Sequence, residues 1–341
     1  MSENSLSPQV TDAIRAMIAE AGVGENEELV ARILATGVML GAEGTSRLDL
    51  KITSAAIAEM REAFALFRPY AAARKVTVFG SARTQEDDSL YHQARDVAAA
   101  LAAQGWMVVT GAGPGIMQAA AEGAGAEMSL GVSIRLPFEE VPNEFVADSP
   151  RVEMKYFFTR KLMLVKESSG FVCLPGGFGT LDEMFELLTL QQTGKAEPQP
   201  IVLLDEPGGT FWAGLSHFVR EYMVPAGVIS PDDFDRVIIT DSVAEAAAEI
   251  AGFWRNYASL RWVGKRLVLR MRQAPTDAEL AELNARFADI CAEGAIERTG
   301  PLRVEVEEND ALDSARLVLT PSPRRVGQLH TLIRAINALA A

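Results

Sequence analysis

The spacing of hydrophobic residues divides the chain into three stretches, of which the first is helical. Residues 1 to about 70 are rich in Ala, Glu, Met and Leu and contain no strand-like run. Near the start, apolar residues recur at the spacing of a helix face, at Ile14, Met17, Ile18 and Ala21. This pattern predicts two or three helices. We therefore expect residues 1–73 to form a helical N-terminal arm that serves packing or oligomerisation.

The second stretch begins at residue 74, where short apolar runs alternate with helical patterns. The predicted strands are Val76–Gly80, Trp106–Thr110, Gly131–Leu136, Phe171–Leu174, Ile201–Leu204 and Val237–Thr240. The helices between them are expected to start near Ser89, Pro114, Glu153, Thr180, Thr210 and Val243. Strands with such continuous apolar runs predict a parallel sheet covered by helices on both faces. We expect residues 74–254 to form a Rossmann-like α/β domain, in which ligands bind beyond the carboxyl ends of the strands.

The third stretch, residues 255–341, has a different pattern. Polar and apolar positions alternate over residues 265–272, which predicts a half-buried strand. Thr276 and Glu279 have the spacing of a capping box, which would open a helix that runs to about Ala292. Two more strands, Leu302–Glu307 and Arg316–Thr320, are predicted before a final helix, Val326–Ala340. The sequence therefore predicts a small C-terminal α+β unit.

Composition and charge narrow the class of protein. The 341 residues are 48% hydrophobic and 23% charged, which is ordinary for a soluble globular protein. The net charge is −14, and an acidic surface repels the phosphate backbone, so we expect no nucleic-acid partner. No apolar run approaches the roughly 20 residues of a membrane span, and the N-terminus lacks the pattern of a signal peptide. We therefore expect a cytoplasmic protein that does not bind membranes.

The strongest chemical signal is a glycine loop, PGGFGTLDE, at residues 175–183. It follows an apolar strand and opens a helix. Gly176, Gly177 and Gly179 allow positive φ angles, which would turn backbone N–H groups inward, and such a nest at a helix N-terminus binds phosphate. Thr180 at the N-cap would add a hydroxyl donor. The alternative is a tight strand-to-helix turn that holds no ligand.

Glu183 has two interpretations that the residues alone leave open. Thr180 and Glu183 have the spacing of a capping box, in which the glutamate reaches back to the N-cap N–H group. However, Asp182 and Glu183 would compete with a bound phosphate for the same helix terminus. That conflict favours a carboxylate that faces the far end of a substrate.

Two further glycine loops follow predicted strands. TGAGPGIM at residues 110–117 has Ile116 where a dinucleotide fingerprint requires glycine, and the next strand ends without the acidic residue that holds a ribose. A Walker A motif is also absent from the sequence, so we expect no nicotinamide or other cofactor. Gly80, Ser81 and Arg83 end the first strand, where they could contribute a hydroxyl and a guanidinium group.

A pair of cations interrupts an apolar run in the helix predicted from about Glu153. Leu162 and Met163 indicate that this helix is well buried, so Arg160 beside Lys161 needs an anionic partner. That partner is either a structural carboxylate or an anion in the active site. The three histidines are dispersed and lack the spacing of metal ligands, so we expect no metal site.

Taken together, three motifs resemble the Lonely Guy (LOG) family, whose members are often labelled lysine decarboxylase-like. They are PGGFGTLDE at residues 175–183, FFTRK at 157–161 and GAGPGIM at 111–117. The resemblance covers residues 74–250 and includes the family hallmark PGGxGTxxE, preceded by an Arg-Lys pair. It implies a phosphoribohydrolase that cleaves a nucleoside 5′-monophosphate, such as AMP or a cytokinin nucleotide, into free base and ribose 5-phosphate. A nucleotide or cofactor carrier on the same fold, without hydrolysis, is the alternative.

The resemblance also implies roles for individual residues. Arg160 and Glu183 correspond to the family's catalytic pair, and a carboxylate suits the oxocarbenium-like transition state of glycosidic cleavage. The resemblance and the glycine loops together predict the following substrate-binding residues: Gly80, Ser81, Gly111, Gly113, Gly115, Met117, Lys161, Pro175, Gly176, Gly177, Phe178, Gly179, Thr180 and Thr189. Phe157 and Phe158 stand where short members have Met-His, which leaves the preferred base open. Family sites lie near a subunit interface, so a homodimer or higher homo-oligomer is implied.

Overall fold

A computed structural model describes residues 6–135, 149–322 and 325–339, and its chain divides into two compact units, Met1–Glu62 and Ala63–Ala341. The first unit contains α1 (Pro8–Glu20), α2 (Glu27–Ala42) and most of α3 (Arg47–Phe67). Helix α1 begins at Pro8 because the Ser7 side chain accepts the backbone N–H of Val10. The predicted N-terminal helices are therefore confirmed, whereas the domain boundaries at residues 73 and 254 stay predictions.

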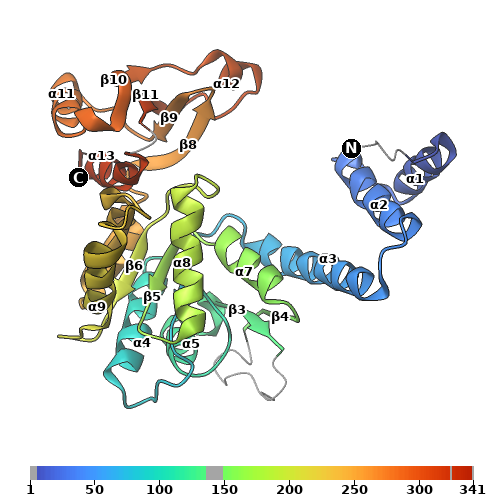
Figure 1. Cartoon of the computed structure of the whole chain (residues 1–341), viewed down its shortest axis with the longest axis horizontal. Helices are drawn as coiled ribbons and strands as arrows, with labels where there is room; N and C mark the ends of the chain where they lie inside the picture. The colour runs from blue at the N-terminus through green and yellow to red at the C-terminus, as the bar shows by residue number, and fades with distance from the viewer. Residues whose placement is uncertain (1–5, 136–148, 323–324, 340–341) are drawn as a thin grey trace. The chain divides into compact units, whose positions relative to one another are not determined.

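A seven-stranded parallel sheet forms the centre of the second unit (Figure 1). Its strands are β1 (Lys75–Phe79), β2 (Met107–Thr110), β3 (Ser129–Ile134), β4 (Arg151–Met154), β5 (Gly170–Cys173), β6 (Ile201–Leu204) and β7 (Val237–Thr240). They lie in the order β4-β3-β2-β1-β5-β6-β7, so the predicted α/β fold is confirmed. The predicted third strand ran to Leu136, which lies outside the described residues.

Helices cover both faces of this sheet. They are α4 (Ser89–Ala102), α5 (Ile116–Ala124), α7 (Phe157–Lys166), α8 (Phe178–Gln192), α9 (Phe211–Phe218) and α10 (Val243–Gly252). Apolar residues of α4, α5 and α10 form one core cluster with Val76 and Val78 of β1. Thr77, between those two valines, faces the other side, where its hydroxyl donates to the carbonyl of Leu164 in α7 over 3.3 Å. Successive side chains of β1 therefore point alternately to the two helical layers on opposite faces of the sheet.

The strand order contains one switch point, between β1 and β5. From β1 the chain builds outward through β2, β3 and β4, and it then crosses back to place β5 on the other side of β1. In open α/β sheets the crevice at such a switch point, beyond the carboxyl ends of the strands, is where ligands bind. The loops after Phe79 and Cys173 end at this crevice.

The C-terminal part of the second unit is a four-stranded antiparallel sheet accompanied by helices (Figure 1). Its elements are β8 (Tyr257–Val263), β9 (Arg266–Met271), α11 (Asp277–Arg286), β10 (Cys291–Thr299), α12 (Arg303–Glu307), β11 (Ala315–Pro321) and α13 (Leu329–Leu339). The predicted capping box is present, because Glu279 accepts the N–H of Thr276 over 2.6 Å and donates its own N–H in return. The predicted α+β unit is thus confirmed.

Three predicted elements are wrong in detail. The predicted strand Leu302–Glu307 is instead the helix α12, because Glu305 caps the N–H of Leu302 and is fully buried against Arg270 and Arg316. The helix expected from Glu153 begins at Phe157, since Glu153 itself lies in edge strand β4. The helix expected to reach Ala292 ends at Arg286, and β10 follows it. No helix in the described part of the chain is long and apolar enough to span a membrane.

Candidate active site

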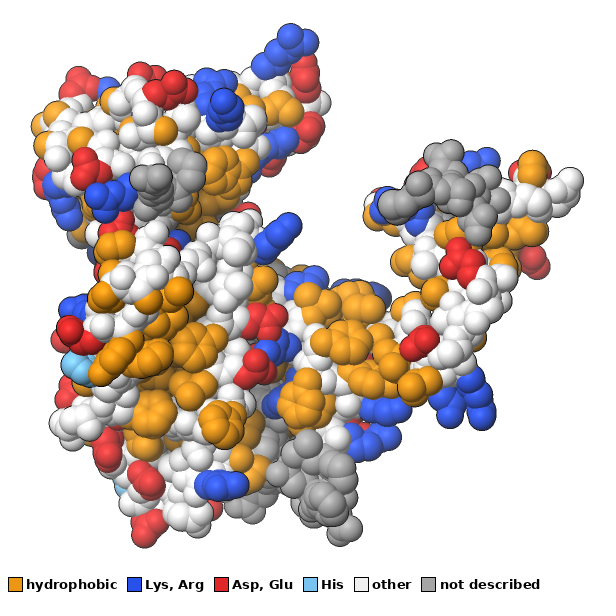
Figure 2. Space-filling view, viewed as in Figure 1, with side chains coloured by type: hydrophobic (Ala, Val, Ile, Leu, Met, Phe, Trp, Pro, Cys, Tyr) orange, Lys and Arg blue, Asp and Glu red, His pale blue; other side chains and the backbone are white. Residues whose placement is uncertain are grey.

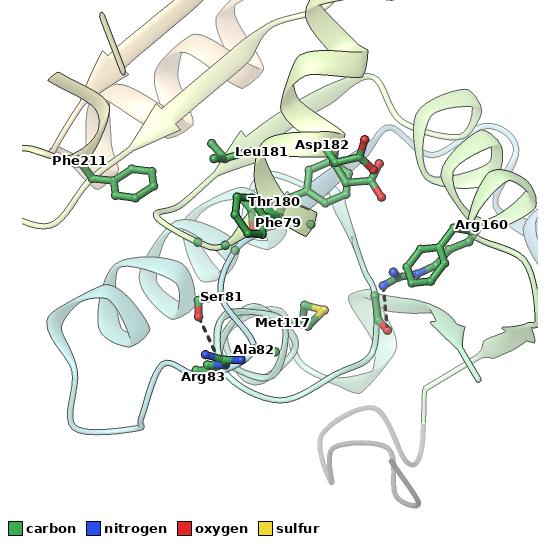
Figure 3. Close-up of a pocket in the computed structure, with 18 residues that line it drawn as sticks. Phe79, Ser81, Ala82, Arg83, Met117, Arg160, Thr180, Leu181, Asp182 and Phe211 are labelled. Carbon is green, nitrogen blue, oxygen red and sulfur yellow. Dashed lines mark hydrogen bonds between the residues drawn. The ribbon is translucent and has the colours of Figure 1, made fainter. Parts of the chain in front are cut away.

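Backbone hydrogen bonds join the three glycine-containing loops at the switch point. The N–H of Ser81, after β1, donates to the carbonyl of Pro175, after β5, over 3.3 Å. The carbonyl of Ser81 accepts the N–H of Ile116, at the start of α5, over 3.0 Å. Ser81 therefore connects all three loops, and Figure 3 shows the residues they place around one cavity.

Close approach between the loops explains several of their glycines. A Cβ at Gly80 would lie 2.5 Å from Cγ2 of Ile116, and one at Gly176 would collide with the Thr180 hydroxyl. Gly115 combines a φ of +68° with a backbone position that would drive a Cβ into the carbonyl of Ser81. Only glycine meets both conditions without strain.

The geometry of the 175–183 loop differs from the expected one. None of its three glycines has a positive φ, and Gly177 is extended, with φ −83° and ψ −161°. The positive angles lie instead in the neighbouring loop, at Ala112 and Gly115. Gly177 and Gly179 have open space where a Cβ would be. The expectation of a left-handed nest is therefore wrong, and what the two glycines provide is room beside the start of α8.

The cavity holds about 750 Å³ and is lined by many of the predicted residues. These are Gly80, Ser81, Gly111, Met117, Arg160, Gly176, Gly177, Phe178, Gly179, Thr180 and Glu183. Gly177 is the N-cap of α8 and makes no side-chain cap, so in the described part of the chain the first N–H groups of the helix remain available at the cavity wall. The partial positive charge of a helix N-terminus suits an anionic group there.

Glu183 is the buried acid of the cavity. Helix α8 begins at Phe178, so Glu183 is its sixth residue, and the capping-box interpretation is wrong. The residue is 7% exposed, and its Oε2 has no hydrogen-bond partner among the described residues. Burial raises the pKa of Glu183 to about 7, although the positive charges of Lys161 and Arg160 act in the opposite direction. The carboxyl group is thus poised to exchange a proton near neutral pH.

Arg160 reaches the cavity from the first turn of α7 (Figure 3). Its Nε donates to the carbonyl of Val132 over 2.9 Å, and its Nη2 lies 3.5 Å from the carbonyl of Gly111. A Cβ at Gly111 would occupy the position of the guanidinium group, which explains the glycine. Strand β3 and the loop that follows β2 therefore orient the guanidinium through backbone carbonyls.

Lys161 lies beside the cavity rather than on its wall. Its Nζ contacts the carboxylates of Asp182 and Glu186, each at 2.6 Å. Burial alone would lower the pKa of Lys161, but these two partners outweigh it and raise the pKa. Asp182 consequently pairs with a lysine, so it does not leave an unpaired anion at the start of α8.

The remaining predicted residues lie outside the cavity lining. Gly115 and Pro175 hold the loops together through Ser81 and Ile116, as described above. A Cβ at Gly113 would lie 2.7 Å from Cε of Met117. Thr189 is exposed on α8, where its hydroxyl donates to the carbonyl of Phe185 over 2.8 Å. Direct substrate contact by these residues stays a prediction.

The cavity has an aromatic rim of three phenylalanines, of which sequence reasoning predicted only Phe178 as a binding residue. Phe157, Phe178 and Phe211 line the cavity with exposed fractions of 57%, 91% and 42%. Hydrophobic side chains gather on this face over α8 and α9 (Figure 2). Each of the three lies in the first turn of a helix at the carboxyl edge of the sheet, and that position was the available signal. Other lining residues not predicted as binding residues are Phe79, Ala82, Arg83, Leu181 and Asp182. Among the described residues, no group of three or more His, Cys, Asp or Glu side chains could hold a metal ion.

Comparisons with known proteins agree with the motifs. A family model described as "Possible lysine decarboxylase" matches residues 115–250. A cytokinin riboside 5′-monophosphate phosphoribohydrolase of Mycobacterium tuberculosis is 32% identical over 161 residues, which cover 46% of this chain and 83% of that protein. A probable enzyme of the same name from Oryza sativa subsp. japonica is 29% identical, over 48% of this chain and 76% of its own. Among solved structures, the molybdenum cofactor carrier protein of Chlamydomonas reinhardtii is 22% identical with a TM-score of 0.38, over 52% of this chain and 96% of its own.

Proposed function

The chain belongs to the Lonely Guy (LOG) family of lysine decarboxylase-like proteins, and on that premise we propose that it is a nucleoside 5′-monophosphate phosphoribohydrolase. The reaction is the hydrolysis of the N-glycosidic bond of AMP or a related nucleotide, which releases the free base and ribose 5-phosphate. Cytokinin nucleotides are candidate substrates because relatives with 32% and 29% sequence identity are named cytokinin riboside 5′-monophosphate phosphoribohydrolases. No cofactor is required by this chemistry.

The observation that carries the proposal is the buried Glu183 carboxyl group, which has an unpartnered oxygen in a cavity that also contains a helix N-terminus. As the glycosidic bond breaks, positive charge develops on the ribose, and a nearby carboxylate stabilises it. The same carboxylate can orient and deprotonate the attacking water. Because the pKa of Glu183 is raised to about 7, a substantial fraction is ionised at neutral pH and the group is a competent base.

The start of α8 is the proposed site of the 5′-phosphate. Its first N–H groups are not capped by a side chain, and Gly177 and Gly179 leave open space where other residues would place a Cβ. A phosphate held there is remote from the bond that breaks. Its binding energy can therefore position the ribose against Glu183.

Arg160 has the role of a fixed positive charge on the same cavity wall. Its hydrogen bonds to the carbonyls of Val132 and Gly111 orient the guanidinium before substrate binds. A charge in that position helps to keep Glu183 ionised and can stabilise negative charge on the departing base. The aromatic rim formed by Phe157, Phe178 and Phe211 offers apolar surface for the planar base.

Base release from a panel of nucleotides tests the proposal. The protein is incubated with AMP, other nucleoside 5′-monophosphates and a cytokinin riboside 5′-monophosphate, in the presence of a chelator, and free base is quantified by chromatography. We expect release from at least one monophosphate. Adenosine is the matched control and should have a kcat/KM lower by roughly two orders of magnitude, because it lacks the group that binds α8.

The outcome separates hydrolysis from simple binding. Tight nucleotide binding without release of any base would reject the hydrolase and establish a carrier. Equal kcat/KM for adenosine and AMP would remove the phosphate role from the start of α8.

A further inference from the structure

Two neighbouring helices carry the two residues that are proposed for catalysis. Arg160 lies in α7 and Glu183 in α8, and both line the active-site cavity. The two helices lie side by side (Figure 1). Helix α7 follows β4, whereas α8 follows β5. The position of Arg160 relative to Glu183 therefore depends on contacts between the two helices.

Lys161 provides such a contact. Its Nζ lies 2.6 Å from Oδ2 of Asp182 and 2.6 Å from Oε2 of Glu186. Asp182 and Glu186 are four residues apart, so they lie one above the other on a single face of α8. Although both carboxylates are more exposed, only 13% of the Lys161 side chain is exposed, so solvent screens these pairs less than pairs on the open surface. One cation of α7 thus joins two successive turns of α8.

The residues that join the helices are sequence neighbours of the residues that line the cavity. Arg160 directly precedes Lys161, and Glu183 directly follows Asp182. Successive residues of a helix point about 100° apart, so each helix presents one side chain to the cavity and the next to the other helix. Lys161 is not among the described residues that line the cavity. A shift at the ion pairs would therefore move both catalytic side chains.

Lys161 also has the largest charge effect on Glu183. Burial raises the pKa of Glu183 to about 7, and the positive charge of Lys161 opposes that shift more strongly than Arg160 does. The charged and titratable groups that act on or respond to Glu183 are Lys161 and Arg160 from α7, Asp182 and Glu186 from α8, and Cys173 from β5. Burial raises the pKa of the Cys173 thiol, so this group stays neutral.

From this geometry we propose that Lys161 is a positioning residue for the reaction, which fixes α8 against α7 so that Arg160 and Glu183 keep their arrangement in the cavity. Its charge also favours the ionised form of Glu183. Lys161 does not itself bind the substrate, which departs from the contact that the family resemblance implies. The effect of Lys161 on turnover rests on the proposed function, whereas its effect on the ionisation of Glu183 does not.

Steady-state kinetics with AMP test the positioning role. Lys161→Met keeps the length of the side chain and removes its charge. At about pH 9, where Glu183 is mostly ionised in both proteins, we expect kcat to be about 10-fold lower because the two helices are no longer held in register. KM should stay within about 2-fold of its original value, since Lys161 makes no contact with the substrate. Lys161→Arg should restore most of the turnover.

The pH profile separates position from charge. In Lys161→Met the midpoint of kcat/KM should move up by about one pH unit, because a positive charge beside Glu183 is lost. A double variant, Asp182→Asn with Glu186→Gln, keeps the lysine and removes both of its partners. It should also lower kcat at about pH 9, but its midpoint should move down, because two negative charges beside Glu183 are lost.

Lys166→Met is the matched control on the same helix. The Nζ of Lys166 pairs with Glu167 and lies over the ring of Phe64, away from α8. The substitution removes the same charge from α7. It should leave kcat, KM and the midpoint unchanged.

Urea denaturation supplies a readout that needs no turnover. The free energy of unfolding is measured against pH for the original protein and for Lys161→Met, each with and without Glu183→Gln. The difference within each pair reports the pKa of Glu183 in the folded state, which should be about one unit higher in Lys161→Met. This shift in a protein that releases no base from any nucleotide would refute the proposed function and leave the action of Lys161 on Glu183 intact.

Two results would overturn the positioning role. A KM for AMP that rises at least about 10-fold in Lys161→Met, with an unchanged midpoint, would make Lys161 a substrate contact. An unchanged kcat at about pH 9 in both Lys161→Met and the double variant would reduce the two ion pairs to surface interactions without a role in the site. If Lys161→Met does not fold, the double variant decides between these outcomes, because it retains the lysine.

Discussion

The burial of Glu183 has opposite consequences for the stability of the folded protein and for its proposed activity. Desolvation raises the pKa of this group from an ordinary 4.5 to about 7, with Lys161 and Arg160 opposing the shift. Because the folded-state pKa is the higher one, the native protein binds the proton more tightly than the unfolded chain does. Stability therefore decreases as pH rises from about 4.5 to about 7, and it remains reduced above that range. An ionised Glu183 therefore destabilises the fold, although the proposed chemistry requires it.

Replacing Glu183 with glutamine separates these two effects. We expect Glu183→Gln to lower kcat by about 10²–10⁴-fold, since the variant lacks the base. We also expect unfolding above pH 7 to require on the order of 1–3 kcal/mol more, because the ionisation penalty disappears. This gain in stability should vanish well below pH 4.5, where Glu183 is neutral in both the folded and the unfolded state of the original protein. The measurements are release of free base from AMP and urea denaturation of both proteins above pH 7 and below pH 4.5. Near-normal turnover of the variant would exclude Glu183 as the base.

The pH dependence of kcat/KM reports the same group. If the ionised carboxylate is the active form, kcat/KM should rise with pH to a midpoint near 7 and then level off. Asp182→Asn should move this midpoint to lower pH, because the negative charge of Asp182 raises the pKa of Glu183. The profile is measured with AMP in both proteins at constant ionic strength. A rate that is flat through neutral pH would contradict this assignment.

The elements of the site show what the sequence could and could not predict. The order of glycine loops after apolar strands was enough to predict one ligand site at the carboxyl edge of the sheet. The start of α8 was not predictable, because Gly177 and Thr180 are both acceptable N-cap residues. The tertiary structure decides it: the Thr180 side chain is buried against Gly176, and Gly177 becomes the cap. Because α8 starts about one turn earlier than an N-cap at Thr180 would place it, Glu183 lies in the second turn, where it faces the cavity and does not cap the helix.

Substitutions of two loop glycines should separate folding from binding. Gly115→Ala should destabilise the protein by about 2–3 kcal/mol, because it strains a positive φ and forces a Cβ into the carbonyl of Ser81. Gly177→Ala should leave stability nearly unchanged, since φ is −83° and no atom lies within 4 Å of the added carbon. It should instead raise KM for AMP by crowding the start of α8. Thermal denaturation and steady-state kinetics distinguish the two, and an unstable Gly177→Ala protein would contradict the open geometry.

Two elements outside the site were mispredicted for different reasons. Residues 302–307 alternate between apolar and polar side chains, as in a strand, yet they form α12 because Glu305 is fully buried between Arg270 and Arg316. A buried carboxylate of this kind requires partners from β9 and β11, which are distant in the sequence. Edge strand β4 was missed because Arg151 and Glu153 on its exposed face interrupt the apolar run. The local pattern therefore failed at α12 because long-range contacts determine its structure, and at β4 because the apolar run of an edge strand is interrupted.

At the scale of the whole molecule, we propose that the working unit is a homodimer or a higher homo-oligomer. Large apolar side chains are exposed on α7, α8 and α9, among them Phe157, Phe158 and Phe178. Exposed apolar patches of this kind mark interaction surfaces on soluble proteins. Light scattering at the assay concentration should give at least twice the mass of one chain, which is 36.8 kDa. An active monomer would refute the prediction.

One buried asparagine holds α13 against residues 253–257, the joint between the parallel sheet and the C-terminal sheet. Oδ1 of Asn337, in α13, accepts the N–H groups of Asn256 and Tyr257, each over 2.8 Å, and its Nδ2 donates to the carbonyl of Phe253. Phe253, at the end of α10, is 1% exposed and belongs to the core cluster of the C-terminal sheet. A truncation near Asn256 would therefore expose this core, so a point substitution is the better test of whether the unit contributes to catalysis.

Asn337→Leu should weaken this joint without reaching the active-site cavity. It leaves buried N–H groups unsatisfied, so we expect the free energy of unfolding to fall by about 2–4 kcal/mol. Asn284→Leu is the matched control, because Asn284 bonds Ile296 and Leu280 within the C-terminal sheet and does not cross the joint. Urea denaturation should show a loss for both variants, while kcat/KM of the folded proteins should stay at its original value. If Asn337→Leu alone lost turnover while still folded and able to bind AMP, the C-terminal sheet would have to support catalysis, and Arg160 and Glu183 would not be the complete machinery.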